Sequence, residues 1–419
     1  MQKNWLVLIF TFFLIQATKA QFNQYCGSLR YDTEVFDSVQ KTADVIYGTN
    51  ISSSGAITTL TLDVYEPVDD TIPNRPLIIW VHGGSFIGGT KADGDVVSLC
   101  EHFAKRGYVC ASINYRLGFS IFPPNPVTAA QTVFRAVQDM KAAVRFFRKD
   151  AATADSFHIN PSIIFGGGSS AGAFTALHLA YLDQPSEIPV GIDTTVLGGI
   201  EGNSGNPGYS STINAVVNLC GALGDKTWIH ENDIPFAAMH GDRDGTVPYN
   251  ADTIFLLGVY PVTVVDGSYS ISEYSNSIGL ANEMYTYYGA DHVPFASNLA
   301  YMDTTVRFVS NFLYKYMGCF PLDPSPLANT FLTGINSVLN ENEISIYPNP
   351  GNGLYKFNFS NFKMINQFLL YDAFGKKLKE FNNLDISTIL DLSDFNRGIY
   401  IYRIEIGDKF FSGKLIKQD

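Results

Sequence analysis

The chain has 419 residues, of which 46% are hydrophobic and 16% are charged, a composition that supports a sizeable buried core and excludes intrinsic disorder. Its formal net charge of -12 argues against a nucleic-acid-binding protein, which needs a basic surface to neutralise phosphates. The same charge predicts little attraction to anionic membranes. The length exceeds that of one average domain.

The first 20 residues have the pattern of a secretory signal peptide. Lys3 precedes an apolar run over Trp5–Ile15, and the small residues of Ala17–Ala20 mark a cleavage site after Ala20. The alternative, a membrane anchor, needs about 20 apolar residues, and this run is shorter. No other stretch is long and apolar enough to span a bilayer, so we predict export without stable membrane insertion.

Residues 21–320 form the next predicted domain, in which strand-like and helix-like segments alternate from about Tyr31 to Tyr316. Short apolar runs, typical of strands buried on both faces, occur at 76–81, 108–113, 163–165, 215–219 and 236–239. Residues 94–106 and 128–150 have the three- and four-residue apolar spacing of amphipathic helices. This alternation predicts an α/β fold, with a mostly parallel sheet and helices on both faces.

The strand at 163–165 leads into Gly168-Ser169-Ser170-Ala171-Gly172, the G-x-S-x-G pattern of a nucleophile elbow. In such an elbow a strand turns sharply into a helix, and glycines flank the serine because a Cβ there would clash. The turn exposes Oγ of Ser170 and aims the backbone N–H of Ala171 at the same point. Ser170 is therefore the candidate nucleophile, and it needs a base and an acid as partners.

Two candidate acids, Asp242 and Asp244, follow the strand at 236–239. This is the end of a strand at which open α/β sheets place their sites. Asp244 is preferred because it lies just ahead of Val247-Pro248, the usual setting of the acid in folds built round this elbow. The alternative is that both aspartates are solvated turn residues.

Folds built round this elbow order their partners as serine, acid and histidine. Of the seven histidines in the chain only His292 lies downstream of Asp244. His292 also follows the last expected strand of the domain, from which a loop can fold back to Ser170. The predicted catalytic residues are therefore Ser170, Asp244 and His292.

The loop His82–Phe86 follows the strand at 76–81, and it matches the HGGG-type loop that donates backbone N–H groups to an oxyanion. Gly83 and Gly84 let the main chain approach the reacting atoms, and Ser85 stands where a third glycine is usual. The predicted oxyanion hole contains Gly83, Gly84, Ser85 and Ala171. Which of the loop N–H groups point inward stays open.

The composition changes after the catalytic region. Prolines at 321, 324 and 326 open a predicted linker over 321–343. Residues 344–419 contain short alternating strands separated by turn signals, and no histidine. We expect a small all-β sandwich there, without catalytic function.

Five cysteines remain after cleavage of the signal peptide, and they form no CxxC pair, so a zinc site is not expected. The odd number leaves at least one thiol unpaired. Cys110 lies in a predicted strand and is expected to be an inert core residue. Cys26 and Cys319 bracket the catalytic region and are candidates for joining its ends, whereas the pairing of Cys100 and Cys220 stays open.

Residues 31–316 resemble α/β-hydrolases of the carboxylesterase and feruloyl-esterase-like kind. The shared segments are the loop 82–86, Asn114-Tyr115-Arg116-Leu117, the elbow 168–172, His240-Gly241 with Asp244, and His292.

The resemblance implies a role for each matched residue. Ser170 would be the nucleophile, His292 the base and then the acid, and Asp244 the orienting acid. Gly83, Gly84 or Ser85, with Ala171, would form the oxyanion hole. Members of this family hydrolyse carboxylic esters without a metal or other cofactor.

The tail resembles the C-terminal sorting domain of type IX secretion, on the segments Tyr347-Pro348-Asn349-Pro350, Asp391-Leu392-Ser393, Gly398-Ile399-Tyr400 and 413–417. This resemblance implies a type IX secretion machinery as partner, and a secreted or cell-surface location after processing of both ends. An alternative is a carbohydrate-binding sandwich with stacking aromatics such as Tyr400 and Tyr402.

The expected function is a secreted serine carboxylic-ester hydrolase, acting on small esters or on ester groups of polysaccharides. A serine peptidase of the same fold and a non-catalytic binding module stay open as alternatives. The segments 198–211 and 254–277 are expected to overhang the site and shape the acyl pocket.

Overall fold

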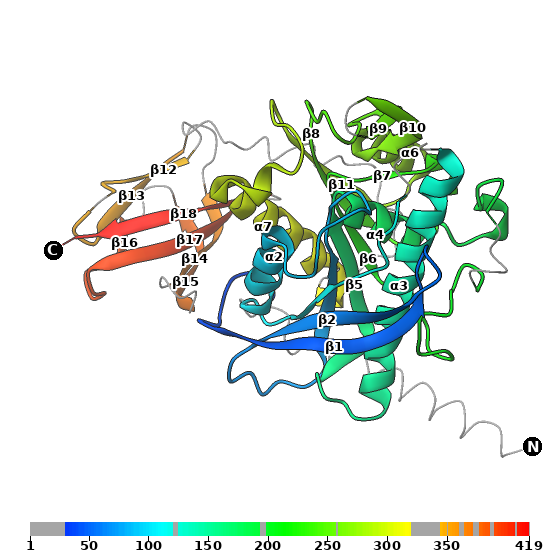
Figure 1. Ribbon diagram of the computed structural model, residues 1–419. Helices are drawn as coiled ribbons and strands as arrows, with labels where there is room; N and C mark the ends of the chain where they lie inside the picture. The colour runs from blue at the N-terminus through cyan, green and yellow to red at the C-terminus, as the bar shows by residue number, and fades with distance from the viewer. Residues whose placement is uncertain are drawn as a thin grey trace, which may run out of the picture. The chain divides into compact units, whose positions relative to one another are not determined.

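We describe the fold from a computed structural model (Figure 1). The structure describes residues 30–119, 125–192, 198–256, 259–319, 344–349, 351–359, 364–371, 377–385, 389–406 and 409–418. The chain divides between Pro321 and Leu322 into two compact units. We call them the first and the second unit and describe each by itself.

A central sheet organises the first unit. Its strands are β1 (Val39–Ile51), β2 (Ile57–Pro67), β3 (Arg75–Val81), β4 (Val109–Ile113), β5 (Ile159–Ser169), β6 (Ala215–Leu219), β8 (Phe236–Gly241) and β11 (Asn282–Tyr287). Their spatial order is β1-β2-β4-β3-β5-β6-β8-β11. The pairs β1–β2 and β2–β4 are antiparallel, and every pairing from β4 to β11 is parallel.

Helices cover both faces of this sheet (Figure 1). They are α2 (Gly94–Ala104), α3 (Pro126–Ala152), α4 (Ala171–Tyr181), α6 (Ser268–Ile278) and α7 (Leu299–Tyr314). Side chains alternate along β3: Leu77 and Ile79 belong to the core cluster shared with α3, α4 and α6. Ile78 and Trp80 belong to the cluster shared with α2 and α7. This two-sided burial explains the continuous apolar run of β3 and confirms the predicted α/β fold.

A second, smaller sheet lies beyond the C-terminal ends of the parallel strands. It has the order β7-β10-β9, with β7 at Ala222–Leu223, β9 at Ala251–Leu256 and β10 at Tyr260–Gly267. The short 3-10 segments η1 (Pro185–Glu187), η2 (Lys226–Trp228) and η3 (Pro294–Ala296) lie in neighbouring loops, and the π-helix η4 (Lys315–Cys319) follows α7.

The second unit contains two antiparallel sheets. One has the order β12-β13-β16 and the other β15-β14-β17-β18. The strands are β12 (Ile344–Tyr347), β13 (Leu354–Phe359), β14 (Met364–Tyr371), β15 (Lys377–Asp385), β16 (Ile389–Asp391), β17 (Gly398–Ile406) and β18 (Lys409–Lys417). Tyr355 and Phe357 from one sheet share a core with Phe368 and Leu415 from the other. The two sheets therefore form the predicted sandwich.

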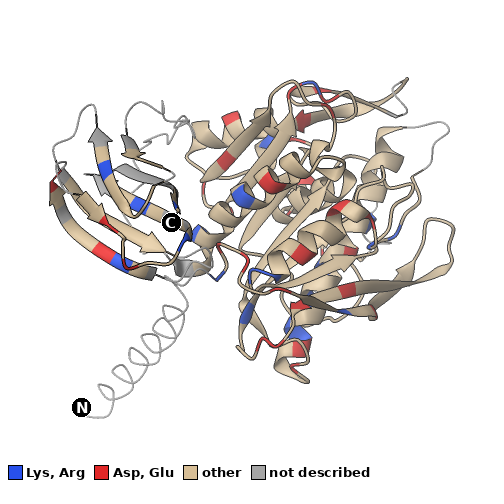
Figure 2. Ribbon diagram, turned by 90° about the vertical axis from the view of Figure 1, so that its left-hand side faces the viewer, with Lys and Arg blue, Asp and Glu red and all other residues tan. Residues whose placement is uncertain are grey.

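Charged residues are interspersed by sign over the described ribbon, with Lys and Arg next to Asp and Glu rather than gathered on one element (Figure 2). Among the described helices, none combines the length and the apolar character that crossing a membrane requires.

Candidate active site

Ser170 occupies a strained corner between β5 and α4. Its φ is 53° and its ψ is -119°, a backbone conformation that is costly for a residue with a side chain. The turn leaves no room for a side chain at either flanking glycine. A Cβ on Gly168 would lie 2.3 Å from the carbonyl carbon of Gly172, and a Cβ on Gly172 would lie 1.9 Å from the carbonyl oxygen of Val81. These clashes explain the two glycines of the motif.

Asp244 lies in the turn that follows β8, with its side chain fully buried. Its Oδ1 accepts hydrogen bonds from the backbone N–H groups of Thr246 and Val247, both at 2.8 Å. These two bonds fix the orientation of the carboxylate, and Oδ2 remains available to other hydrogen-bond donors. Asp242, the rejected alternative, is exposed, and its Oδ1 accepts a hydrogen bond from the N–H of Gly289 instead.

His292 reaches the site from the loop after β11. Asp291 ties that loop to the turn of Asp244, because its Oδ1 accepts from the N–H of Gly245 at 2.9 Å and from the N–H of His292 at 2.7 Å. Val293 has a φ of 49°, an uncommon conformation for a β-branched residue. The loop is therefore held in one specific conformation.

The structure brings the three predicted residues together. Nε2 of His292 lies 2.8 Å from Oγ of Ser170, and Nδ1 lies 2.6 Å from Oδ2 of Asp244. A carboxylate can only accept, so Nδ1 carries the proton and Nε2 is free to accept the hydroxyl proton of Ser170. Burial alone would raise the pKa of Asp244, but hydrogen bonds from His240 and His292 hold that pKa well below its usual range. The arrangement can activate a serine nucleophile.

His240 is part of this network, although the sequence did not assign it a role. It is fully buried, and its Nε2 lies 3.0 Å from Oδ2 of Asp244. Its Nδ1 lies 2.6 Å from Oγ of Ser268, which also accepts from Asn218 Nδ2 at 2.9 Å. The available signal was its place at the end of β8, four residues before Asp244.

The predicted oxyanion residues also gather at Ser170. A Cβ on Gly83 would lie 3.2 Å from Cβ of Ser170, and Ser85 and Ala171 line the same cavity as Ser170. Gly84 has a φ of 105° and its carbonyl closes a turn by accepting from Ile87. The N–H of Ala171 starts α4 and therefore has no acceptor within the helix.

A cavity of about 800 Å³ opens beside Ser170. Most of its wall is apolar, with side chains from α3, α4, η2, β9 and β10. This wall includes Ile254, Phe255 and 262–265. These residues of the segment 254–277 therefore border the site, as predicted. Residues 268–277 of that segment belong to α6, which packs on a face of the central sheet.

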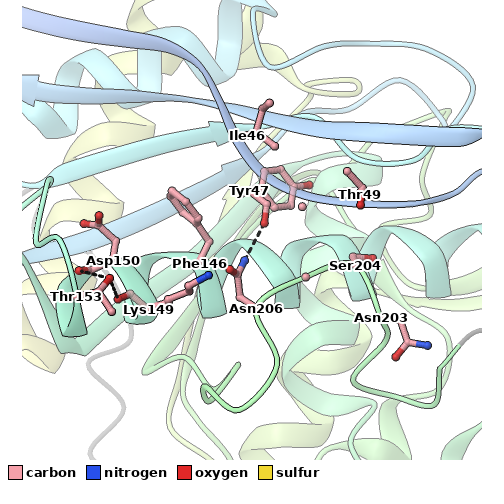
Figure 3. A pocket seen from close by; sticks show the side chains of 12 residues that line it. Ile46, Tyr47, Thr49, Phe146, Lys149, Asp150, Thr153, Asn203, Ser204 and Asn206 are labelled. Carbon is pink, nitrogen blue, oxygen red and sulfur yellow. Dashed lines mark hydrogen bonds between the residues drawn. The ribbon is translucent and has the colours of Figure 1, made fainter.

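The segment 198–211 does not overhang the site, so that expectation is wrong. Glu201 forms ion pairs with Lys141 at 2.9 Å and Arg145 at 3.0 Å on α3. Asn206 donates to the carbonyl of Tyr47 on β1 at 2.8 Å. These polar contacts hold the segment against α3 and β1, where it borders a separate hollow of about 400 Å³ (Figure 3).

The one group of possible metal ligands among the described residues is Cys220 with Asp244 and His292, whose ligand atoms lie within 4.8 Å of one another. Burial raises the pKa of the Cys220 thiol to about 12, so it is protonated at neutral pH and a poor ligand. Asp244 and His292 already hydrogen-bond to each other. This group therefore suits a triad better than a metal.

Cys100, Cys110 and Cys220 are buried and free. The expectation of an inert Cys110 agrees with this burial, which raises the pKa of its thiol well above the usual range. Cys26 lies outside the described residues, and so does the side chain of Cys319. Their pairing stays a prediction.

Residues 62–224 match the BD-FAE family model. The first unit carries a BD-FAE domain. The match includes the loop 82–86 and the elbow, whereas Asp244 and His292 lie downstream of it. Residues 345–418 match the model of the secretion system C-terminal sorting domain, so the second unit carries a sorting domain.

The BD-FAE domain is similar to esterases of other organisms. The chain is 31% identical over 121 residues to gut esterase 1 of Caenorhabditis briggsae, covering 29% of this chain and 20% of that protein. It is 29% identical over 175 residues to esterase LipC of Mycobacterium tuberculosis, covering 41% and 37%. The chain thus spans a fifth of the first relative and just over a third of the second.

The solved structure of Thermogutta terrifontis esterase 2 phosphorylated by paraoxon is 24% identical, with a TM-score of 0.46, and covers 69% of this chain and 97% of that one. Together with the family match, the curated relatives place the BD-FAE domain among esterase-like α/β-hydrolases.

Proposed function

We propose that the protein is a secreted serine hydrolase that cleaves carboxylic esters through an acyl-enzyme. The observation that carries the proposal is the chain of short contacts from Ser170 Oγ to His292 Nε2 and from His292 Nδ1 to Asp244 Oδ2. The esterase relatives favour an ester as substrate over a peptide.

In the first step Oγ of Ser170 attacks the ester carbonyl carbon while Nε2 of His292 takes the hydroxyl proton. The buried carboxylate of Asp244 stabilises the imidazolium that forms. The negative charge on the carbonyl oxygen is stabilised by backbone N–H groups of the loop 83–85 and by that of Ala171. Collapse of the intermediate breaks the bond to the alcohol oxygen, which takes the proton from His292.

In the second step a water molecule attacks the acyl group on Ser170. Nε2 of His292 takes a proton from this water and later returns it to Oγ of Ser170. The products are a carboxylic acid and an alcohol, and the enzyme returns to its starting state.

The test of this proposal is the hydrolysis of 4-nitrophenyl acetate by the wild type and by Ser170→Ala. Because the variant lacks the nucleophile, we expect kcat to fall by roughly 10³-fold or more. Ser169→Ala is the matched control, since Ser169 belongs to β5, and it should lose much less. A Ser170→Ala enzyme that keeps most of its activity overturns the proposal.

We also propose that the signal peptide and the sorting domain carry the enzyme out of the cell through a type IX secretion machinery. The sorting-domain match supports this route. In a host with this machinery, the full chain should accumulate at the cell surface or in the medium. A chain lacking residues 344–419 should remain in the periplasm, and its release at the full-length level would contradict the proposal.

A further inference from the structure

Exposed apolar side chains surround the opening of the large cavity beside Ser170. Val190, in the loop after η1, is 98% exposed, Val264 on β10 is 61% exposed and Phe255 on β9 is 46% exposed. Each of them lines the cavity and faces solvent as well, so they lie where the cavity opens. Ile87, just beyond the loop 82–86, does the same.

Two further valines extend this ring. Val127, at the start of α3, is exposed and lies next to the loop of Val190, because a Cβ on Gly191 would be 3.3 Å from its Cγ2. Val259 is exposed on the hairpin, between β9 and β10. We call six residues the apolar rim: Ile87, Val127, Val190, Phe255, Val259 and Val264.

The hairpin of β9 and β10 carries apolar side chains on both of its faces. Ile254 and Val265 contribute to a core cluster with α4, and the strand register places them on the same face. Phe255 and Val264 lie on the other face, since neighbouring residues of a strand point to opposite sides. A sheet with one solvated face normally carries polar residues there. The outer face of this hairpin therefore suits an apolar environment better than water.

No basic side chain accompanies the apolar rim in the described wall of the cavity. The ionisable side chains of that wall are Glu187, Asp225 and His178. Burial lowers the pKa of His178 to about 4, so its ring is neutral at pH 7. An anionic surface would gain no ion pair here and would be repelled by the two acids. An uncharged surface is therefore the better match.

The position of the apolar rim limits what can cover it. An exposed apolar patch of this kind marks an interaction site. A folded protein or a second copy of this chain, seated on the rim, would cover the opening of the cavity beside Ser170. The surface of an aggregated ester would cover the same side chains and supply ester molecules to the cavity at the same time.

Resting on the proposed function, we propose that the apolar rim docks on the surface of aggregated, uncharged esters, such as droplets, with the cavity facing that surface. Adsorption removes the rim side chains from water, which stabilises the docked state. An ester molecule then enters the cavity from the aggregate without first dissolving in water. The rim thus selects the physical state of the substrate, whichever acyl group the cavity accepts.

The first measurement is the hydrolysis of tributyrin by the mature full chain, below and above the concentration at which droplets form. The rates on dissolved tributyrin define a saturation curve, and an enzyme that uses dissolved ester alone stays on this curve when droplets appear. We expect the rate to exceed the curve by about threefold or more once droplets are present, because adsorbed enzyme meets ester at a high effective concentration.

The second measurement separates adsorption from catalysis. Ser170→Ala leaves the droplets intact, and its adsorption is followed by flotation with the droplets. Adding Val190→Ser and Val259→Ser should weaken adsorption by about tenfold or more, since each change removes an apolar side chain from the docked surface.

Ile46→Ser is the matched control for these two substitutions. Ile46 is also 61% exposed, but it borders the separate hollow near the other end of α3, so adsorption should stay within about twofold. In the active enzyme, Val190→Ser with Val259→Ser should return the rate on droplets to the saturation curve. The rate of this variant on dissolved tributyrin verifies that it is folded.

The outcomes separate this inference from the proposed function. An enzyme that hydrolyses no dissolved ester contradicts the proposed function, whereas the adsorption measurement still tests the rim. Droplets that neither raise the rate nor bind the protein overturn the inference and leave the esterase proposal standing. Adsorption that prefers phosphatidylcholine vesicles to droplets, or a dimer that the two serine substitutions dissociate, assigns the rim to another partner and overturns the inference as well.

Discussion

The carboxylate of Asp244 accepts hydrogen bonds on both oxygens, two from backbone N–H groups at Oδ1 and two from histidines at Oδ2. These four hydrogen bonds hold the carboxylate in the orientation in which Oδ2 faces His292. The second histidine, His240, is itself held by Ser268. The orientation of His292, the proposed base, therefore depends on residues that do not line the cavity beside Ser170.

We predict that His240→Phe lowers kcat by about 10- to 100-fold, the range seen when a residue that orients a reactive group is removed. KM should change by less than about threefold, because His240 does not line the cavity. His102→Phe is the control, since His102 is 38% exposed and pairs with Glu34 away from the site. An unchanged kcat with a lowered melting temperature would assign His240 to packing alone.

At this scale the sequence predicted the three residues that the structure brings into contact, but not the full hydrogen-bond network around them. Ser170, Asp244 and His292 could be found because the elbow fixes their order and because one histidine lies downstream. The contact between His240 and Ser268 joins residues 28 positions apart, and it depends on how α6 returns to β8. No local pattern encodes that contact.

At the scale of elements, α4 begins so close to β3 that its first turn excludes a side chain at Gly172. A Cβ there would lie 1.9 Å from the carbonyl oxygen of Val81, and a backbone group cannot rotate away as a side chain does. Both elements are buried, so relief requires shifting α4 within a close-packed core.

We therefore predict that Gly172→Ala lowers the free energy of unfolding by more than about 2 kcal/mol, measured by urea denaturation. Gly94→Ala is the matched control, because a Cβ at that position meets nothing within 4 Å. It should change the stability by less than about 0.5 kcal/mol. Equal stability of the two variants would contradict the close packing of α4 on β3.

The sequence predicted the helices of the first unit better than the positions of its loops. The helix expected at 128–150 is found at Pro126–Ala152, and it starts where Asn125 accepts a hydrogen bond from the N–H of Thr128. Periodicity locates such an element well. The loop at 198–211 was misplaced because its position depends on ion pairs between Glu201 and α3, and loop composition does not reveal these partners.

At the scale of the whole molecule, every residue of the proposed mechanism lies in the first unit. The second unit has its own core, formed by residues of its two sheets. We predict that a protein of residues 21–321 hydrolyses 4-nitrophenyl acetate with kcat within about twofold of the mature full chain. A folded truncated protein that has lost this activity would show that the sorting domain takes part in catalysis.

Covalent labelling with a fluorophosphonate, followed by intact-mass measurement and peptide sequencing, is the decisive experiment for the proposed role of Ser170 as the nucleophile. We predict one adduct per chain, located on Ser170 rather than Ser169, and ester hydrolysis that falls in proportion to labelling. The adduct should be absent from Ser170→Ala. An adduct on another residue, or hydrolysis that persists after complete labelling, would contradict the assignment of Ser170 as the nucleophile.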